Sequence, residues 1–301
     1  MTHIFITGAN SFVGARLQEL CRERGLDYSG IDVMGPFCKQ IVEADLRSEA
    51  LANLIPKGSV VVHLAAISRD GDCAADPNNA MSVNLGGTAN VSTAAIKAHA
   101  NRVVFASSEW VYGRSPSTGP LIEAMGPAWA DLDSLYAFSK AAGEQIVWAN
   151  SSQLPVSILR FGIIYGPRSS NWSAFEYVVN SAISGKVAIG SAKTSRRFIH
   201  VGDVCSGILT AAGESSDRSH IWNLSGPSSL SLGEIAKAVE TLLGIHVTVT
   251  ESLPEEPSIR NPLPDLMQNE TSWQPTLDTN RGVSDVLTFL GVDTMQELKG
   301  D

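Results

Sequence analysis

Short apolar runs alternate with longer helical segments through the first half of the chain. The apolar runs are brief, rich in Val, Ile and Phe, and bounded by turn residues, which is typical of buried strands: residues 3–7, 59–64 and 102–107. The longer segments are rich in Ala, Leu, Gln and Glu and predict helices: residues 14–24, 83–99 and 136–149. This alternation predicts an α/β fold with a doubly wound, mostly parallel sheet and helices on both faces.

After residue 160 the pattern loosens. Gly166 and Pro167 break the chain, residues 174–184 predict a helix, and residues 198–212 predict a strand followed by a helix. From Leu253 onward prolines prevent long regular elements, at positions 254, 257, 262, 264 and 275.

A chain of 301 residues lies near the upper limit for one hydrophobic core, so we expect a smaller C-terminal lobe interleaved with the sheet domain. We assign residues 1–167 and 198–224 to the sheet domain, and residues 168–197 and 225–301 to the lobe.

The composition narrows the possible partners. With 44% hydrophobic and 18% charged residues the chain is typical of a globular protein, and a net charge of −9 disfavours nucleic acid and anionic membranes. The four cysteines are scattered without CxxC spacing, so we expect reduced thiols and no metal site. The start of the chain has no basic leader before an apolar stretch, and no run approaches the roughly 18 apolar residues of a membrane span. We therefore expect a cytoplasmic protein.

A glycine-rich segment from Thr7 to Gly14 follows the first predicted strand and opens a helix. Glycine lets the backbone approach a pyrophosphate closely, and the helix N-terminus presents unpaired N–H groups, although such turns also occur for packing alone. Asp32 ends a probable second strand roughly 20 residues further on, where a carboxylate accepts hydrogen bonds from ribose and repels a 2′-phosphate. NAD is thus favoured over NADP. A turn or cap aspartate is the alternative.

Tyr136 and Lys140 are four residues apart and therefore share one face of a predicted helix. An ammonium beside a phenol stabilises the phenolate, which can exchange a proton with a substrate hydroxyl. Ser107 and Ser108 end a predicted parallel strand, at the sheet edge where ligands bind. Either serine can hold a substrate oxygen, or the pair can start a loop or cap a helix.

Taken in order, these residues resemble the extended short-chain dehydrogenase/reductases, in particular the NAD-dependent nucleotide-sugar epimerase/dehydratase family, over nearly the whole chain. The segments that carry the resemblance are TGANSFVG (7–14), DLR (45–47), HLAA (63–66), NLGGT (84–88), SSEWVYG (107–113), YAFSK (136–140), LRFGIIYGPR (159–168) and RRFIHVGD (196–203).

The resemblance implies a Rossmann domain that binds NAD and a lobe that binds a nucleotide-diphosphate sugar. It makes Ser108, Tyr136 and Lys140 the catalytic triad, because Ser108 lies four positions before Tyr112. Tyr136 and Lys140 are also implied to bind the cofactor, and Lys140 holds the nicotinamide ribose. The other cofactor-binding residues that it implies are Gly8, Asn10, Ser11, Phe12, Val13, Gly14, Asp32, Asp45, Leu46, Leu64, Ala65, Ala66 and Asn84.

On the substrate side, Arg196 matches the arginine that binds the substrate diphosphate, and Arg260 is a looser candidate for a second contact. Ser108 and Glu109 complete the implied substrate site, whereas a surface salt bridge is the alternative for the arginines. His200 is expected to be structural.

Three positions depart from the family pattern. Ser11 replaces a glycine of the turn, Gly162 replaces an asparagine, and Arg197 replaces an aspartate. We expect Ser11 to affect the backbone of the turn, Gly162 to remove a substrate contact, and Arg197 to make its surroundings more basic.

The reaction is indicated by the two residues after Ser108. In relatives that dehydrate the sugar an Asp-Glu pair stands there, whereas this chain has Glu109 and Trp110, so dehydration is disfavoured. We expect an epimerase that returns the hydride to the opposite face of a keto-sugar. The alternatives are a keto-sugar reductase or dehydrogenase and, less favoured, a non-catalytic NAD-binding scaffold. By the resemblance, helices 83–99 and 136–149 would pair in a homodimer.

Overall fold

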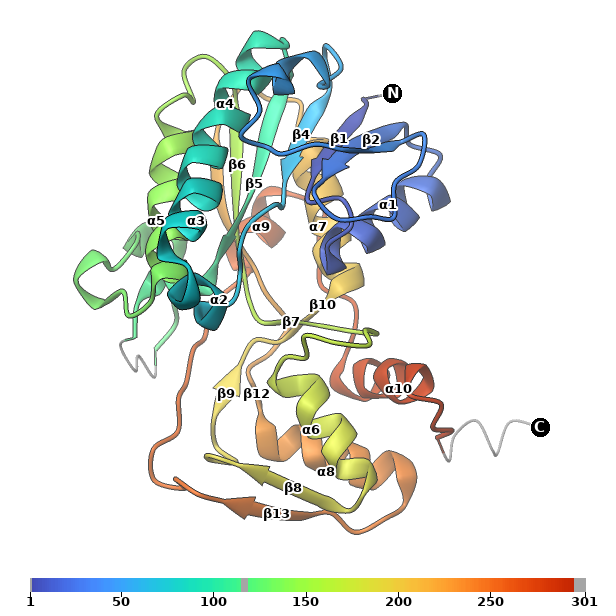
Figure 1. Ribbon diagram of the computed structural model, residues 1–301. Coiled ribbons are helices and arrows are strands. Elements are labelled where there is room, and N and C mark those ends of the chain that lie inside the picture. Colours follow the sequence, from blue (N-terminus) through green and yellow to red (C-terminus); the bar gives the residue numbers. More distant parts are fainter. Residues whose placement is uncertain (1, 115–118, 295–301) are drawn as a thin grey trace.

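We describe residues 2–114 and 119–294 of the protein from a computed structural model. The chain forms a sheet domain, in the upper part of Figure 1, and a smaller lobe below it. Within the described residues the main sheet has seven strands in the order β11-β6-β5-β4-β1-β2-β3, and every neighbouring pair is parallel. The strands are β1 (Ile4–Thr7), β2 (Tyr28–Asp32), β3 (Ile41–Glu43), β4 (Val60–His63), β5 (Arg102–Ser108), β6 (Val156–Phe161) and β11 (His220–Leu224).

Both faces of the sheet are covered, which explains why its central strands are apolar without interruption. Side chains alternate between the faces: Phe5 packs with helices α4 (Thr88–Lys97) and α5 (Leu135–Trp148), and Ile4 packs with helices α1 (Phe12–Glu23) and α7 (Val201–Ala212). The predicted doubly wound parallel sheet is therefore confirmed.

The segment expected as one helix over residues 83–99 begins earlier and changes its winding. It runs through α3 (Pro77–Met81), a π-helical stretch η2 (Ser82–Gly87) and α4. A short helix α2 (Asp70–Ala75) precedes it. Short 3₁₀ segments complete the sheet domain: η1 (Glu49–Asn53), η3 (Glu109–Tyr112), η4 (Glu123–Met125) and η5 (Trp129–Asp131).

The lobe has its own core between three helices, α6 (Ala174–Ile183), α8 (Leu232–Leu243) and α10 (Thr279–Phe289). Short strand pairs surround these helices: β7 (Ile164–Tyr165) with β10 (Ile199–His200), β8 (Lys186–Ile189) with β13 (Thr248–Glu251), and β9 (Ser195–Arg196) with β12 (Leu230–Ser231). Helix α10 is regular because it begins after the last proline, Pro275.

One segment departs from the expected division of the chain. Residues after 225 were assigned to the lobe, but helix α9 (Asp265–Glu270) packs against β11 on the sheet domain. Met267 and Trp273 are buried in the core of that domain, and the indole N–H of Trp273 donates to the carbonyl of Asp203 at 3.1 Å. The chain returns because these side chains cover apolar surface of α7 and β11. Residues 295–301 of the expected lobe lie outside the described residues.

Candidate functional site

The turn after β1 depends on two glycines. Gly8 has a φ of +70°, and a Cβ at this position would lie 2.7 Å from the backbone nitrogen of Ala65. A Cβ on Gly14 would lie 2.3 Å from the carbonyl oxygen of Gly8. Glycine is therefore required at both positions, because the turn folds back onto the first turn of α1 and against the end of β4.

Ser11 fits the turn despite its side chain. Its φ is −65°, which any residue adopts, and its hydroxyl caps α1 by accepting from the N–H of Gly14 at 3.1 Å. The expected backbone problem at Ser11 therefore does not arise. The N–H groups of Phe12 and Val13 lie in the first turn of α1, where the helix supplies no carbonyl partner. These groups and the helix dipole are suited to a pyrophosphate.

Asp32 ends β2 beside this turn, as predicted. One carboxylate oxygen accepts from the backbone N–H of Asn10 at 2.8 Å and the other from that of Met34 at 3.0 Å. Each oxygen keeps a lone pair for a ribose hydroxyl. The amide of Asn10 donates to the carbonyls of Met34 and Pro36, so this side chain fixes the loop after β2.

Asp45 and Leu46 lie beyond β3. The Asp45 carboxylate pairs with Arg47 at 2.5 Å, and this hydrogen bond lowers the pKa of Asp45. Leu46 is buried against Gly87, where a Cβ would lie 2.1 Å from a Leu46 methyl. Leu46 is thus held by packing against the π-helical stretch.

The end of β4 lines the same edge of the sheet with Leu64, Ala65 and Ala66. The side chain of Asn84 is occupied by the protein: its oxygen accepts from the N–H of Ile67 at 2.8 Å, and its NH₂ donates to the Ile67 carbonyl and to the Ser139 hydroxyl. Asn84 therefore connects the loop after β4 to α5, beside Lys140.

Ser108, Tyr136 and Lys140 come together at the end of β5. Helix α5 is capped by Ser134, and it can approach β5 closely because a Cβ on Gly143 would lie 2.7 Å from the Phe105 ring. The Lys140 ammonium donates to the carbonyl of Ala106 at 2.8 Å and lies 5.8 Å from the centroid of the Tyr136 ring.

Burial controls the protonation of the triad. It raises the pKa of Tyr136 to about 12, against a hydrogen bond with Ser108 that lowers it. Burial also lowers the pKa of Lys140 to about 8. The sequence predicted that Lys140 stabilises the phenolate, whereas in this structure the group that opposes the rise in the Tyr136 pKa is the hydroxyl of Ser108.

The two adjacent serines have different surroundings. The Ser107 hydroxyl donates to Glu144 at 2.5 Å, and Glu144 forms a buried ion pair with Arg160 at 2.8 Å. Both hydroxyls contact α5: Ser108 bonds to Tyr136 in the first turn of the helix, whereas Ser107 bonds to Glu144 two turns further on and belongs to this internal network.

The proposed substrate residues also converge. Glu109 is fully buried, and its carboxylate lies 3.4 Å from Nε of Arg196. Arg260 lies 4.1 Å above the Trp110 ring and donates to the Glu109 carbonyl at 3.4 Å. Three segments that are distant in the sequence thus meet beside Ser108.

The remaining departures from the family pattern have a packing explanation. A Cβ on Gly162 would lie 2.6 Å from the carbonyl oxygen of Arg197. Glycine therefore lets the chain directly after β6 pass close to the backbone of Arg197. Arg197 itself donates to Asn261 and to the carbonyls of Gly226 and Pro227, which joins segments of the lobe.

His200 has a structural role in this arrangement, as expected. Its ring accepts from the N–H of Gly202 at the start of α7, and its other nitrogen lies 2.8 Å from Asp285.

Sequence reasoning assigned no role to Arg168. Its guanidinium lies 4.5 Å above the Phe12 ring, at the start of α1, and pairs with Glu176 at 2.6 Å. Arg168 therefore brings a positive charge toward the pyrophosphate turn. The only signal in the sequence was its place at the end of the 159–168 motif.

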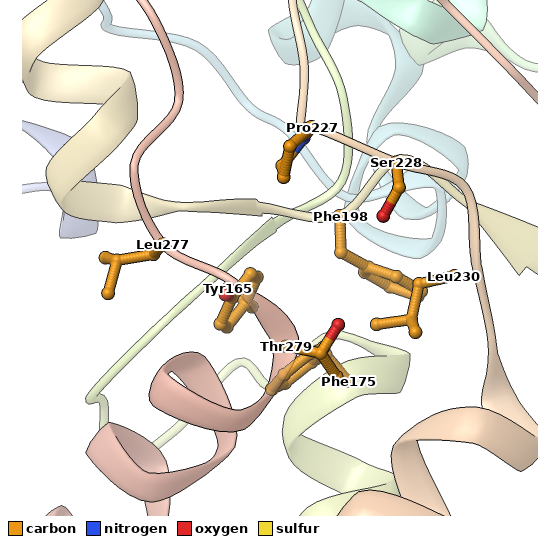
Figure 2. A pocket seen from close by; sticks show the side chains of 8 residues that line it. All are labelled: Tyr165, Phe175, Phe198, Pro227, Ser228, Leu230, Leu277 and Thr279. Atoms are coloured by element: carbon orange, nitrogen blue, oxygen red, sulfur yellow. The ribbon is translucent and has the colours of Figure 1, made fainter.

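A cavity of about 10 Å³, with room for about one water, lies elsewhere in the molecule. Figure 2 shows the side chains that line it. It lies in the lobe and is not part of the candidate site. Its lining residues are Tyr165, Phe175, Phe198, Pro227, Ser228, Leu230, Leu277 and Thr279. In the part of the chain that the structure describes, no helix is long and apolar enough to cross a membrane, and no group of three His, Cys, Asp or Glu side chains could hold a metal ion.

The structure combines a parallel sheet, a glycine turn that leads into a capped helix, and a Ser-Tyr-Lys group at the carboxyl edge of the sheet. This combination is the architecture of a dinucleotide-dependent enzyme. Comparison with known proteins agrees: the profile of the NAD dependent epimerase/dehydratase family matches residues 4–225. The chain belongs to the NAD-dependent epimerase/dehydratase family.

Individual relatives match over most of their length. The chain is 25% identical to the uncharacterised UDP-glucose epimerase YtcB of Bacillus subtilis, covering 85% of this chain and 87% of the relative. It is 26% identical to the UDP-glucose 4-epimerase of Mycolicibacterium smegmatis, covering 94% and 97%. The structure of the UDP-glucuronic acid 4-epimerase of Bacillus cereus in complex with UDP-glucuronic acid and NAD has a TM-score of 0.81 at 22% identity, covering 96% and 99%. This last likeness confirms the fold.

Proposed function

We propose that the chain is an NAD-dependent epimerase of nucleotide-diphosphate sugars that acts by reversible hydride transfer at a carbinol carbon. The observation that carries this proposal is the hydrogen bond between Ser108 and Tyr136, with Lys140 beside them, at the sheet edge that also holds the pyrophosphate turn. The capped start of α1 and the free lone pairs of Asp32 fit NAD, which would bind across this edge.

When bound, NAD supplies the acceptor and later the donor of the hydride. Ser108 holds the substrate hydroxyl, and Tyr136 in its phenolate form takes the hydroxyl proton as the carbon loses its hydride, which leaves a ketone. Tyr136 then returns the proton when the hydride returns to the opposite face. The Ser108 hydroxyl stabilises the phenolate through its hydrogen bond, and the nearby Lys140 ammonium would add its positive charge during this exchange. The sugar changes configuration at one carbon, and no reductant is consumed.

Dehydration is disfavoured by the residue after Glu109. The Trp110 indole occupies the position at which a second carboxylate would be needed, and Arg260 stacks on it. An indole has no basic group, so Trp110 cannot remove a carbon-bound proton as a carboxylate would.

For the substrate we propose a UDP-hexose, with epimerisation at carbon 4. The support is that relatives over most of the chain are named UDP-glucose epimerases, and that Arg196 and Arg260 meet beside the triad, where guanidinium groups suit a diphosphate.

We further propose a cytoplasmic homodimer. The support for a dimer is the outward face of α5, where Leu135, Phe138 and Trp148 are 37%, 42% and 39% exposed. Exposed apolar side chains gathered on one surface element are typical of an interface.

The test is to incubate the purified protein with a panel of nucleotide sugars, with and without added NAD or NADH, and to identify the products. Conversion of a UDP-hexose to its 4-epimer without stoichiometric consumption of cofactor would support the proposal. NADH consumption equal to product formed would identify a reductase instead, and a lack of turnover with every sugar despite bound NAD would favour a non-catalytic protein.

A further inference from the structure

The carboxylate of Glu109 is buried without a hydrogen bond. Neither of its oxygens has a hydrogen-bond partner among the described residues, and its contact with Arg196 is an ion pair at 3.4 Å. The terminal nitrogens of Arg196 are directed elsewhere: they donate to the Ser258 carbonyl and hydroxyl and to the Ser195 carbonyl. A buried carboxylate with so little compensation is costly in its ionised form.

Among the described residues, two charged groups act directly on Glu109. Arg196 approaches from β9 and Arg260 from the segment after β13, and both favour the ionised form of Glu109. Asp133, before α5, acts on Arg260 and is itself paired with Arg114 at 3.0 Å. Burial outweighs the two arginines and raises the pKa of Glu109 to about 7, so this group exchanges its proton near neutral pH.

The net charge of Glu109, Arg196 and Arg260 depends on whether Glu109 carries this proton. With Glu109 ionised, one of the two positive charges is neutralised internally. With Glu109 protonated, this carboxylate compensates neither guanidinium charge, and the two charges match a diphosphate that carries a negative charge on each phosphate. An ionised Glu109 would also repel the incoming phosphate across the same guanidinium.

We propose that Glu109 is a positioning residue that competes with the substrate diphosphate for Arg196 and takes up a proton when the diphosphate binds. The inference rests on the proposed function, since it requires the diphosphate to lie against Arg196 and Arg260. Its consequence is that affinity for a nucleotide sugar falls as the pH rises above about 7, by up to about tenfold per pH unit.

The probe is UDP-glucose, whose diphosphate does not titrate near neutral pH. Calorimetric titrations at about pH 8, in two buffers with different ionisation enthalpies, measure the protons taken up per ligand bound. We expect wild-type protein to take up close to one proton more than Glu109→Gln, and this difference removes any contribution of Lys140, whose pKa is also about 8. Glu109→Gln should also bind UDP-glucose with an affinity that changes little between about pH 6 and pH 9.

Glu123→Gln is the matched control. Burial raises the pKa of Glu123 too, but this carboxylate accepts from the N–H of Asn223 rather than facing Arg196. Its proton uptake should equal that of wild type. Arg196→Met should weaken UDP-glucose binding at every pH, which tests the diphosphate assignment separately.

The outcomes are distinguishable. If UDP-glucose binds through Arg196 and wild type takes up no more protons than Glu109→Gln, this inference is wrong while the proposed function stands. If UDP-glucose does not bind at any pH, or Arg196→Met binds it normally, the diphosphate assignment fails and the inference fails with it.

Melting curves of the free protein provide a second measurement. The ionised form of Glu109 destabilises the fold, because its folded pKa lies above its unfolded value. The Tm advantage of Glu109→Gln should therefore grow from about pH 5 to about pH 8. A Tm difference that does not change over this range would overturn the inference, and these curves also establish that the variant folds.

Discussion

At the scale of single residues, the candidate site combines buried groups that are costly for the fold and useful for proton exchange. Tyr136 and Lys140 both lie in surroundings that disfavour their charged forms, which is typical of groups that exchange protons in catalysis. In the free protein near neutral pH, Tyr136 is therefore a neutral phenol, whereas Lys140 is still mostly an ammonium that loses its proton more readily than an ordinary lysine. Removal of the substrate hydroxyl proton requires the phenolate form of Tyr136. This phenol therefore has to lose its own proton inside the buried site before the reaction.

Tyr136→Phe should leave the fold and NAD binding intact and reduce turnover by about 10² to 10⁴-fold, because only the phenolic oxygen is lost. Steady-state kinetics with the sugar identified in the panel, together with NAD titrations, measure both effects. Ser108→Ala should be less severe, since a water can partly replace the hydroxyl. The control is Ser107→Ala, which weakens the internal network with Glu144 but leaves the triad in place. If Ser107→Ala damages turnover more than Ser108→Ala, the assignment of the serine is wrong.

Lys140→Met should separate activity from stability. The folded pKa of about 8 lies below the ordinary value of 10.5, so the charged lysine destabilises the fold below about pH 8. The variant should gain as much as about 3 kcal/mol in unfolding free energy there, and the gain should shrink as the pH rises from about 8 to 10.5. Denaturant unfolding at several pH values tests this, while turnover and NAD affinity should both fall. A variant that is less stable than wild type at about pH 7 would contradict the expected sign.

At the scale of elements, the turn between β1 and α1 is the tightest part of the site. Gly14→Ala should lower both the Tm and the NAD affinity, because the new Cβ would lie 2.3 Å from the carbonyl oxygen of Gly8. Backbone atoms cannot move away without distorting the turn. Gly71→Ala in α2 is the control, since no atom lies within 4 Å of its Cβ position, and it should be neutral or slightly stabilising. Thermal melts and NAD titrations measure both variants. If the two changes have equal effects, the turn does not require glycine at position 14.

The end of β2 should determine the choice of dinucleotide. Combining Asp32→Ala with Met34→Arg removes a repulsive carboxylate and adds a phosphate partner at a position that is 72% exposed. We expect weaker NAD binding and a relaxed selection against NADP, measured as the ratio of the two dissociation constants. The single change Met34→Arg is the control and should alter this ratio less. If wild-type protein already binds NADP as well as NAD, Asp32 does not contact the ribose.

Elements with a strong local signal could be predicted from the sequence. The strands at residues 4–7, 60–63 and 102–108 follow continuous apolar runs, and Ser134 caps α5 just before Tyr136. The π-helical stretch before α4 could not be predicted, because it arises where Leu46 packs against Gly87 and Asn84 bonds the loop after β4. Helix α8 was also missed, although its Ser231 and Glu234 form a capping box.

At the scale of the whole molecule, the site depends on contacts that no local pattern contains. The family pattern named Arg196 and Arg260, but their meeting with Glu109 joins positions up to 151 residues apart. Similarly, Trp273 returns from beyond the lobe to pack on the sheet domain. Such contacts follow from burying apolar surface across the entire chain, so sequence reasoning found the residues and not their arrangement.

The homodimer is the last prediction at this scale. The outward face of α5 leaves Phe138 and Trp148 exposed, and Trp129 extends this apolar surface by packing edge-on against Phe138 at 6.4 Å. Pairing this face with that of a second copy would remove these side chains from water, and a two-fold axis would make the contact self-complementary. Phe138→Glu should therefore place charges in the contact and give a monomer that remains folded. The control is Phe289→Glu on α10, because Phe289 is 48% exposed on the lobe and its substitution should not affect assembly. Light scattering at micromolar concentration measures both variants. A wild-type monomer under these conditions would refute the prediction, and a Phe138→Glu dimer would place the interface elsewhere.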